Sequence, residues 1–396
     1  MKSAKSVYFD NSSTSIPKAP GVAEAINTYL STSPYNKGRG GYKGGYDIAM
    51  QVLEARELLA KFFNAADPRE VIFTPSTTYA LNMVIDGYLK PGDHVITTSM
   101  EHNSVMRPLH ALTEFGIEYD VVQCDETGVF DPEDIRELIR EETFAVIMTH
   151  ASNVCGTVLP IKKVGALCQE EGLRFIVDAA QTAGVLNIDV QRDQIDALCF
   201  PGHKALLGPT GIGGMVIKTD FAEAVEPTIW GGTGSLSDDF EQPDFLPDKF
   251  EPGTPNVPGI LGLKAAIEHL NKTGIESIYK HEMKLYRHFV KGASKIEGIR
   301  LWAADDANIQ KVPALSVDFP NHDNAEITTA LDKEYGIMVR CGLHCSPAAH
   351  KTLRTFPKGT VRFSFGHANT IEEVDYTLAS IKALLEKEDS EASDES

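Results

Sequence analysis

The sequence predicts an α/β protein with a mostly parallel sheet in a large domain and a smaller C-terminal α+β domain. Apolar strand-like runs alternate with amphipathic helical patterns from about residue 15 to 220, which is typical of a parallel sheet flanked by helices. The chain of 396 residues is long enough for a large core and two domains. After residue 258 a new series of helices and strands begins.

The composition is that of an ordinary globular protein, with 42% hydrophobic and 23% charged residues. A formal net charge of −19 argues against a nucleic-acid or anionic-membrane partner. No run approaches the roughly 18 apolar residues of a membrane span, and the first residues lack the apolar segment of a signal peptide. We therefore expect a cytoplasmic protein whose six cysteines are reduced thiols.

The first strand of the series begins at Glu70 and runs through Ser76, Thr77 and Thr78 into a helical pattern. Free backbone N–H groups and hydroxyls at a helix N-terminus suit a phosphate. Thr77 and Thr78 are therefore candidate phosphate ligands, although Ser and Thr at a helix start commonly act only as caps.

The next strand covers residues 93–102 and ends in a histidine. The flat ring of His102 can stack on an aromatic ligand, and a satisfied surface histidine is the simpler alternative. A further strand, 144–150, precedes a helical pattern that begins at Ile161. This repetition of strand and helix continues the alternation that predicts the sheet.

Residues 174–181 are typical of a short buried strand, and they include Asp178. The following apolar strand, from Asp196, leads into His203, Lys204 and a glycine-rich return. A lysine in a crowded, partly desolvated site can form a Schiff base with an aldehyde cofactor, and pyridoxal phosphate also needs an acid that keeps its ring nitrogen protonated. Taken singly, a surface lysine and a helix-capping aspartate are commoner. Together, Lys204 and Asp178 indicate a cofactor site in the crevice beyond the strand ends.

Residues 231–258 form a long irregular segment, which in a compact protein is more often functional or interfacial than idle. We expect a large domain at 15–258, a small domain formed by 1–14 and 259–386, and a disordered acidic tail at 387–396 that has little to bury. The elements predicted after the irregular segment are helices at 260–271, about 275–296 and 371–385, and strands near 313–319 and 359–365.

A second chemically informative segment contains Arg340 and Cys345 and is followed by Arg362. The planar fork of arginine binds a carboxylate in bidentate fashion, so either arginine is a candidate for holding an amino-acid substrate. A thiol near a histidine and basic residues is favoured as thiolate. Metal binding by Cys341, His344, Cys345 and His350 is the alternative, but the second ligand pair of a structural zinc site is absent from the sequence, so we predict no metal. Four further cysteines lie in or beside apolar runs and are expected to be core residues: Cys124, Cys155, Cys168 and Cys199.

Taken together, these segments resemble the class V aminotransferase fold and, within it, the cysteine desulfurase and selenocysteine lyase group. The likeness covers nearly the whole chain. The motifs that carry it are Tyr8-Phe-Asp-Asn-Ser-Ser-Thr, Ser76-Thr-Thr-Tyr-Ala-Leu-Asn, Glu101-His-Asn, Ser152-Asn-Val-Cys-Gly-Thr, Val177-Asp-Ala-Ala-Gln, Gly202-His-Lys, Glu251-Pro-Gly-Thr-Pro-Asn and Arg340-Cys-Gly-Leu-His-Cys.

The resemblance implies a fold type I enzyme that depends on pyridoxal 5'-phosphate. Lys204 then binds the cofactor aldehyde, His102 stacks on the ring and Asp178 pairs with the ring nitrogen. The remaining cofactor contacts that it implies are Gln181 to the ring hydroxyl, Asn153 beside the cofactor and substrate, Thr77, Thr78 and His203 to the phosphate, and Thr254 to the phosphate of the partner subunit. The last contact implies a homodimer.

The same resemblance implies that Cys345 accepts sulfur as a persulfide while L-cysteine becomes L-alanine, and that Arg362 binds the substrate carboxylate. A sulfur or selenium acceptor protein is the expected partner. The alternatives are selenocysteine lyase activity on L-selenocysteine, which need not use Cys345, and another class V reaction such as transamination or C–S cleavage that leaves Cys345 dispensable. A non-catalytic thiol or metal carrier is a further alternative.

Three positions depart from the pattern of the group. Pro201 stands where a hydroxyl residue commonly contributes to the phosphate site, Ser12 and Ser13 replace an alanine-rich version, and Cys341 adds a thiol. These differences leave the predicted fold unchanged and bear on the phosphate contacts and the substrate.

Overall fold

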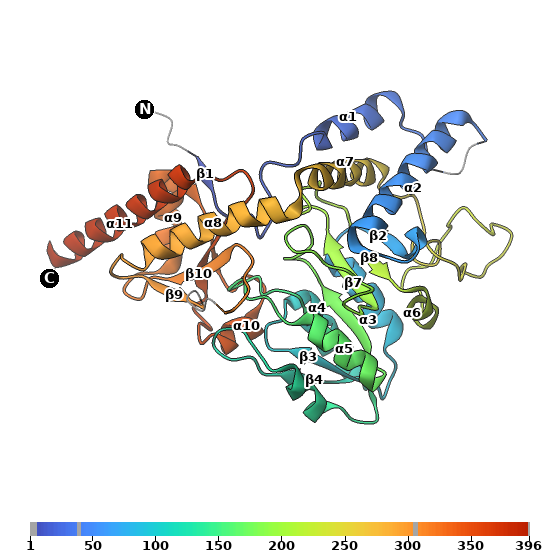
Figure 1. Ribbon diagram of the computed structural model, residues 1–396, viewed down its shortest axis with the longest axis horizontal. Coiled ribbons are helices and arrows are strands. Elements are labelled where there is room, and N and C mark those ends of the chain that lie inside the picture. The colour runs from blue at the N-terminus through green and yellow to red at the C-terminus, as the bar shows by residue number, and fades with distance from the viewer. Residues whose placement is uncertain (1–5, 38–40, 304–307, 395–396) are drawn as a thin grey trace.

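The computed structural model describes residues 6–37, 41–303 and 308–394, and it places them in two lobes joined beside the long helix α8, Ile275–Ala293 (Figure 1). The larger lobe is built on a seven-stranded sheet of order β2-β8-β7-β6-β5-β3-β4. Its strands are β2 (Val71–Thr74), β3 (His94–Thr98), β4 (Glu118–Val122), β5 (Thr143–Thr149), β6 (Arg174–Asp178), β7 (Ala197–Pro201) and β8 (Gly213–Ile217).

The predicted mostly parallel sheet is confirmed, with one reversal. Strand β8 runs antiparallel to both of its neighbours, β2 and β7. It forms from the end of the glycine-rich return after Lys204, where the sequence pattern does not predict a strand. At Gly214 a Cβ atom would lie 2.4 Å from the carbonyl oxygen of Ile72. A side chain there would force the backbone apart, so glycine permits the close pairing of β8 with β2.

Helices cover both faces of this sheet, as the alternation predicts. Along β5, Ala145 and Ile147 pack in one core cluster and Val146 and Met148 in the other, because successive residues of a strand point to opposite faces. The helices that pack on one face are α3 (Thr77–Tyr88), α4 (Asn103–Leu112) and α6 (Thr219–Ala224), and those on the other are α1 (Val22–Thr32), α2 (Lys43–Phe63), α5 (Ile161–Glu171) and α7 (Val257–Thr273).

Helix α7 falls on the large-domain side of the packing, whereas the sequence analysis assigned residues from 259 onward to the small domain. Ile260, Leu263 and Leu270 are buried in the same core cluster as α1 and α2. Apolar residues line most of this helix, and periodicity alone does not reveal which core they fill. The apolar residues of α8 from Met283 onward pack in the core of the smaller lobe.

The smaller lobe holds a four-stranded antiparallel sheet of order β12-β13-β10-β9. The N-terminal segment returns to it, since β1 pairs in parallel with β11 and Asp10 bridges to Ser364. The elements of this lobe besides α8 are β1 (Val7–Tyr8), β9 (Arg300–Trp302), β10 (Ala314–Asp318), β11 (Ile337–Met338), β12 (Arg340–Gly342), β13 (Thr360–Ser364), α9 (Asn324–Tyr335), α10 (Pro347–Thr352) and α11 (Ile371–Asp394).

Helix α11 continues to Asp394, so the backbone of 387–394 is helical where the composition predicts a disordered tail. Glu, Ala and Lys are strong helix formers, and they extend a helix that is already packed on the lobe. Across the described residues, no helix is long and apolar enough to cross a membrane.

Candidate active site

A cavity of about 100 Å³ lies at the C-terminal ends of β2, β5, β6 and β7. It brings together most of the cofactor-site residues that the sequence predicts. Its lining is Ser76, Thr77, Thr78, His102, Ser104, Thr149, Ala151, Asn153, Asp178, Ala180, Gln181, Pro201, His203 and Lys204. Strand ends that are far apart in the sequence therefore share one site, which is where open α/β sheets bind ligands.

Lys204 lies three residues after the end of β7, in the connection to β8. Burial lowers the pKa of its amine to about 8, although Asp178 opposes this shift and Arg362 and Arg340 add to it. An amine with this pKa is partly neutral near physiological pH, and the neutral form is the nucleophile. Lys204 is therefore suited to attack a carbonyl in the cavity.

Asp178 is the last residue of β6 and is only 2% exposed. Its Oδ1 accepts a hydrogen bond of 2.8 Å from the backbone N–H of Ala180. Burial raises the pKa of the carboxyl, while this hydrogen bond and Lys204 lower it. A cationic ring nitrogen bound in the cavity would supply the positive charge that the buried carboxylate needs.

His102 is the N-cap residue of α4, and its ring is held in place from one side. Nδ1 accepts a hydrogen bond of 3.0 Å from the backbone N–H of Ser104 and lies 2.9 Å from the Ser104 hydroxyl. Burial, with Lys204 and nearby arginines, lowers the pKa of His102 to about 4. The ring is therefore neutral near pH 7, and because Nδ1 accepts, we assign its proton to Nε2.

Two buried polar atoms in this cavity have no hydrogen-bond partner among the described residues: Thr77 Oγ1 and His203 Nδ1. Thr77 is the first residue of α3, where backbone N–H groups are free. Thr78 is exposed, and its hydroxyl lies 2.8 Å from that of Ser104. Pro201 lines the same region but offers neither a hydroxyl nor an N–H. The unpartnered atoms at a helix N-terminus fit an anionic group such as a phosphate.

Residues 343–346, which we call the thiol loop, are bonded to two residues beside the cavity. The side chain of Asn153 donates to the carbonyl of His344 at 2.7 Å and accepts from the Ser346 hydroxyl at 2.6 Å. The backbone N–H of Asn103 donates to the carbonyl of Cys345 at 2.8 Å. Asn153, predicted as a cofactor and substrate contact, thus also fixes the thiol loop.

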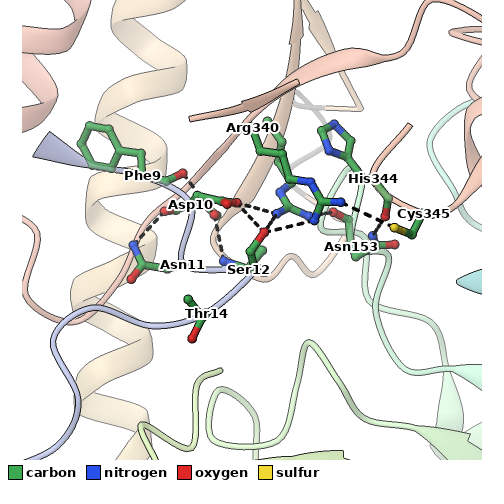
Figure 2. Close-up of polar contacts among 12 residues, drawn as sticks. Phe9, Asp10, Asn11, Ser12, Thr14, Asn153, Arg340, His344 and Cys345 are labelled. Carbon is green, nitrogen blue, oxygen red and sulfur yellow. Dashed lines mark hydrogen bonds and ion pairs between the residues drawn. The ribbon is translucent and has the colours of Figure 1, made fainter. Parts of the chain in front are cut away.

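Cys345 is exposed and has a positive φ of 61°. Arg340 donates to its Sγ at 3.5 Å, and Figure 2 shows Asp10, Arg340 and Cys345 brought together from the N-terminal segment, β12 and the thiol loop. Arg340 therefore contacts the thiol as well as being a candidate for the substrate.

Arg362 is 1% exposed and is held by three partners. Its Nη2 donates to Asp10 Oδ1 at 2.7 Å and to Ser13 Oγ at 2.8 Å, and its Nη1 donates to the carbonyl of Asn153 at 2.9 Å. Burial lowers the pKa of the guanidinium while Asp10 raises it. Its buried Nε has no partner among the described residues, so one N–H remains for a ligand oxygen.

Gln181 lines the lysine cavity, and its side-chain amide donates to the carbonyl of Ser12 at 3.2 Å.

Thr254 is exposed and lines a separate, larger cavity together with Tyr79 and Ile229. Thr254 therefore does not line the lysine cavity of its own chain.

The cysteine and histidine cluster of the metal alternative is not assembled. In the part of the chain that the structure describes, no group of three or more His, Cys, Asp or Glu residues is placed to hold a metal ion. His344 lies 3.1 Å from the carbonyl of Thr360 through Nε2, and Nδ1 of His350 lies 2.6 Å from the Thr355 hydroxyl. Cys341 is partly buried against the core of the smaller lobe.

The sequence analysis did not predict the contacts of two serines. Ser13 accepts hydrogen bonds from Arg340 and Arg362. The backbone N–H of Ser104 donates to the ring of His102. The signal for Ser104 was its place in the first turn of a helix that follows His102. For Ser13 the only signal was the departure from an alanine-rich motif.

A half-buried lysine that shares a cavity with a buried acid at the strand ends of an α/β sheet is the arrangement of a Schiff-base-forming enzyme. The family model for Aminotransferase class-V matches residues 7–377. The chain therefore belongs to the class-V aminotransferase family, and the resemblance predicted from the motifs is confirmed.

Individual relatives agree. A probable cysteine desulfurase of Methanothermobacter thermautotrophicus is 38% identical over 373 residues, which are 93% of this chain and 92% of the relative. The apo structure of the cysteine desulfurase of Thermococcus onnurineus NA1 matches with a TM-score of 0.90 at 31% identity, covering 97% of this chain and 95% of that one. The S-sulfonic acid form of the Escherichia coli cysteine desulfurase CsdA matches with a TM-score of 0.85 at 30% identity, covering 96% and 95%.

Proposed function

We propose that this protein is a pyridoxal 5'-phosphate-dependent cysteine desulfurase, which converts L-cysteine to L-alanine and takes the sulfur onto Cys345 as a persulfide. The observation that carries the proposal is the attachment of the thiol loop to Asn153, a residue that lines the lysine cavity. A thiol carried on that loop is next to the place where a substrate on Lys204 would react. The relatives named cysteine desulfurase support the same reaction.

The residues present fit the cofactor. Thr77 at the start of α3 and His203 in the connection after β7, whose Oγ1 and Nδ1 have no partner among the described residues, would hold its phosphate. Asp178 would pair with its ring nitrogen and Lys204 would bind its aldehyde. His102, neutral and fixed by Ser104, would pack on the ring. When bound, pyridoxal phosphate supplies an aldehyde for the amine and an electron-poor ring that stabilises negative charge on the substrate.

Side chains of the protein would carry out proton transfer, carboxylate binding and sulfur transfer. The Lys204 amine, with its lowered pKa of about 8, is placed to take the α-proton of the substrate. Arg362 offers its free Nε–H to the substrate carboxylate. Arg340 would hold the sulfur of Cys345 in position through its contact of 3.5 Å with Sγ. The thiolate forms an S–S bond with the substrate sulfur while the Cβ–S bond breaks, and Cβ then takes a proton, so that alanine leaves and the persulfide stays.

We propose that the protein acts as a homodimer. Large apolar side chains are exposed around the cavity that contains Thr254, and they include Tyr79 at 51%, Ile229 at 45% and Trp230 at 64% exposure. A second copy would bury this surface and bring Thr254 towards the partner's phosphate site. Light scattering of the full-length protein measures the mass directly, and a monomer at micromolar concentration would contradict this assembly.

The test of the reaction is alanine release from L-cysteine by the cofactor-loaded protein, together with persulfide detection at Cys345. We expect wild type to release alanine and to carry the persulfide. Cys345→Ser should retain the Schiff-base absorbance and lose persulfide formation, and Lys204→Ala should lose both. Lys272→Ala, on the exposed side of α7, is the matched lysine control. Alanine release that survives in Cys345→Ser would overturn the persulfide route.

The same assay with L-selenocysteine decides between the two substrates of the group. Selenium release that persists in Cys345→Ser would identify a lyase reaction that shares the site. The sulfur acceptor protein is likewise a proposal, and a purified acceptor would remove the persulfide in a stoichiometric transfer.

A further inference from the structure

The hydroxyl of Ser13 lies between three charged groups. It donates to Asp10 Oδ1 at 2.8 Å, and it accepts from Arg362 Nη2 at 2.8 Å and from Arg340 Nη1 at 3.2 Å. A serine hydroxyl has one donor and two acceptor positions. All three positions are used here, so the hydrogen-bonding capacity of the Ser13 hydroxyl is fully satisfied by these groups.

The three charged groups do not balance each other. Arg340 and Arg362 are paired residues on the neighbouring strands β12 and β13, so their like charges lie side by side. Arg340 lowers the pKa of Arg362, which shows the repulsion between them. Within the group formed with Asp10, two cations share one carboxylate, and a substrate carboxylate would supply the second negative charge.

Besides its hydrogen bond to Ser13, each arginine has a further group that bears on the proposed reaction. Arg362 is the residue with a free buried Nε–H, and Arg340 donates to Cys345 Sγ at 3.5 Å. Arg340 divides its two terminal nitrogens between Ser13 and the thiol. The position of Ser13 therefore affects both the group that would hold the substrate and the group that holds the thiol.

We propose that Ser13 is a positioning residue that couples substrate docking to the state of the thiol. It fixes the spacing of the two guanidiniums, so that the carboxylate site on Arg362 and the contact of Arg340 with Cys345 are formed together. This inference rests on the proposed desulfurase function. It assigns a role to a position where the sequence departs from the alanine-rich form of its group.

Without this hydroxyl the cluster would lose its only neutral bridge. An alanine at position 13 would leave Asp10 with Arg362 alone and would leave Arg340 Nη1 without its partner. Long charged side chains that lose a hydrogen-bond partner regain rotamer freedom. We therefore expect Arg340 to move away from the thiol and the carboxylate site to become less ordered.

The experiment compares Ser13→Ala, Ser13→Thr and Ser277→Ala in the cofactor-loaded, full-length protein. Threonine keeps the hydroxyl. Ser277→Ala is the matched serine control, because Ser277 is exposed on α8 and lies outside the group formed by Ser13, Asp10 and the two arginines. The first readout is steady-state alanine release at varied L-cysteine, and the second is the rate at which iodoacetamide alkylates Cys345 without substrate. The alkylation uses a Cys341→Ala background, since the four remaining cysteines are buried.

We expect Ser13→Ala to raise the KM for L-cysteine about fivefold, with a smaller change in kcat, and to slow alkylation about threefold, as the loss of a hydrogen bond to charged groups implies. Ser13→Thr should restore both values to within about twofold of wild type, and Ser277→Ala should change neither. A change in only one readout for Ser13→Ala, or in neither, would overturn the coupling. So would failure of threonine to rescue.

These outcomes are separate from those that test the proposed function. A wild-type protein that releases no alanine refutes the desulfurase reaction, whatever the alkylation rates show. A wild type that releases alanine while Ser13→Ala matches it refutes only the inference. Retained Schiff-base absorbance in each variant shows that the fold and the lysine cavity are intact.

Discussion

Single residues acquire their chemistry in this protein from burial more than from neighbouring charges. For Lys204, His102 and Asp178 the largest cause of the pKa shift is the removal of the side chain from water. Desolvation disfavours the charged form of each group. The result is an amine that is partly neutral near physiological pH, a neutral imidazole and a buried carboxyl whose charged form needs a cation, all in one cavity.

The lowered pKa of Lys204 predicts how cofactor loading depends on pH. The neutral amine is the reactive form, so the rate of Schiff-base formation in cofactor-free protein should rise with pH and level off above about 8, where an ordinary lysine would continue to gain up to 10.5. Stopped-flow absorbance after addition of pyridoxal phosphate measures this rate. Asp178→Asn removes a charge that raises the pKa, so its midpoint should move to lower pH. A wild-type midpoint near 10 would contradict this account of the cavity.

The identity of these residues could be predicted from the sequence, because each follows an apolar strand and parallel strand ends meet at one edge. Their hydrogen-bond partners could not. Ser13 reaches Arg362 across 349 positions of the chain, and Ser104 contacts His102 only because α4 begins there. No local pattern reports contacts between segments so far apart, and these contacts determine which nitrogen of a ring or a guanidinium stays free.

Among the elements, the thiol loop is the one whose behaviour the structure defines most clearly. Both ends of the Asn153 amide are bonded to it, and Cys345 is held through its own carbonyl. Short loops that satisfy their backbone groups in this way have few alternative conformations. We expect Cys345 to stay beside the cavity, so that a sulfur acceptor must approach it there.

Release of this loop should damage sulfur transfer without removing the cofactor. Asn153→Ala breaks two hydrogen bonds to the loop, and we expect persulfide formation to fall roughly tenfold or more, in line with about 1 kcal/mol for each bond lost. Ser346→Ala breaks only one of them and should give an intermediate loss. Single-turnover persulfide formation measures the step, and Schiff-base absorbance is the control. Equal rates in Asn153→Ala and wild type would show that the loop is held by other contacts.

Elements with a clear pattern, such as α8 and strand β7 before Lys204, agree with the sequence prediction, whereas three other elements do not. β4 carries charged residues and gives no clear apolar run, and β8 is rich in glycine. α7 is apolar on most of its surface, so its pattern does not identify the lobe to which it belongs. In each case packing against other segments decides the outcome, which propensity does not encode.

At the scale of the whole molecule, a third cavity lies where the two lobes meet, and it contains a buried acid. Glu282 of α8 is 5% exposed and lines this cavity with Lys204, Val312 and His367. Burial raises the pKa of its carboxyl to about 8. Folded protein therefore keeps a proton on Glu282 that unfolded protein releases above about pH 4.5.

The sign of this shift predicts a pH-dependent stability. The contribution of Glu282 is complete below about pH 4.5 and is lost as pH rises through about 8, because the folded state must then ionise a buried group. Glu282→Gln cannot ionise, so its Tm relative to wild type should increase by at least about 3 °C between pH 5 and pH 8.5. The buried histidines and Glu101 are the same in both proteins and cancel in this difference. Glu276→Gln, an exposed position on the same helix, should show no such trend in calorimetry, and a trend equal to that of Glu282→Gln would refute the assignment.

The reversed strand β8 has a consequence for motion during turnover. Since β7 and β8 are adjacent and antiparallel, the stretch that bears Lys204 is a hairpin connection whose two ends both continue into hydrogen-bonded strands of the sheet. Its backbone has little room to travel. When Lys204 forms and releases its bond to a ligand, the movement must then come from rotation about the bonds of its four methylene groups. The backbone of the surrounding strands does not need to move.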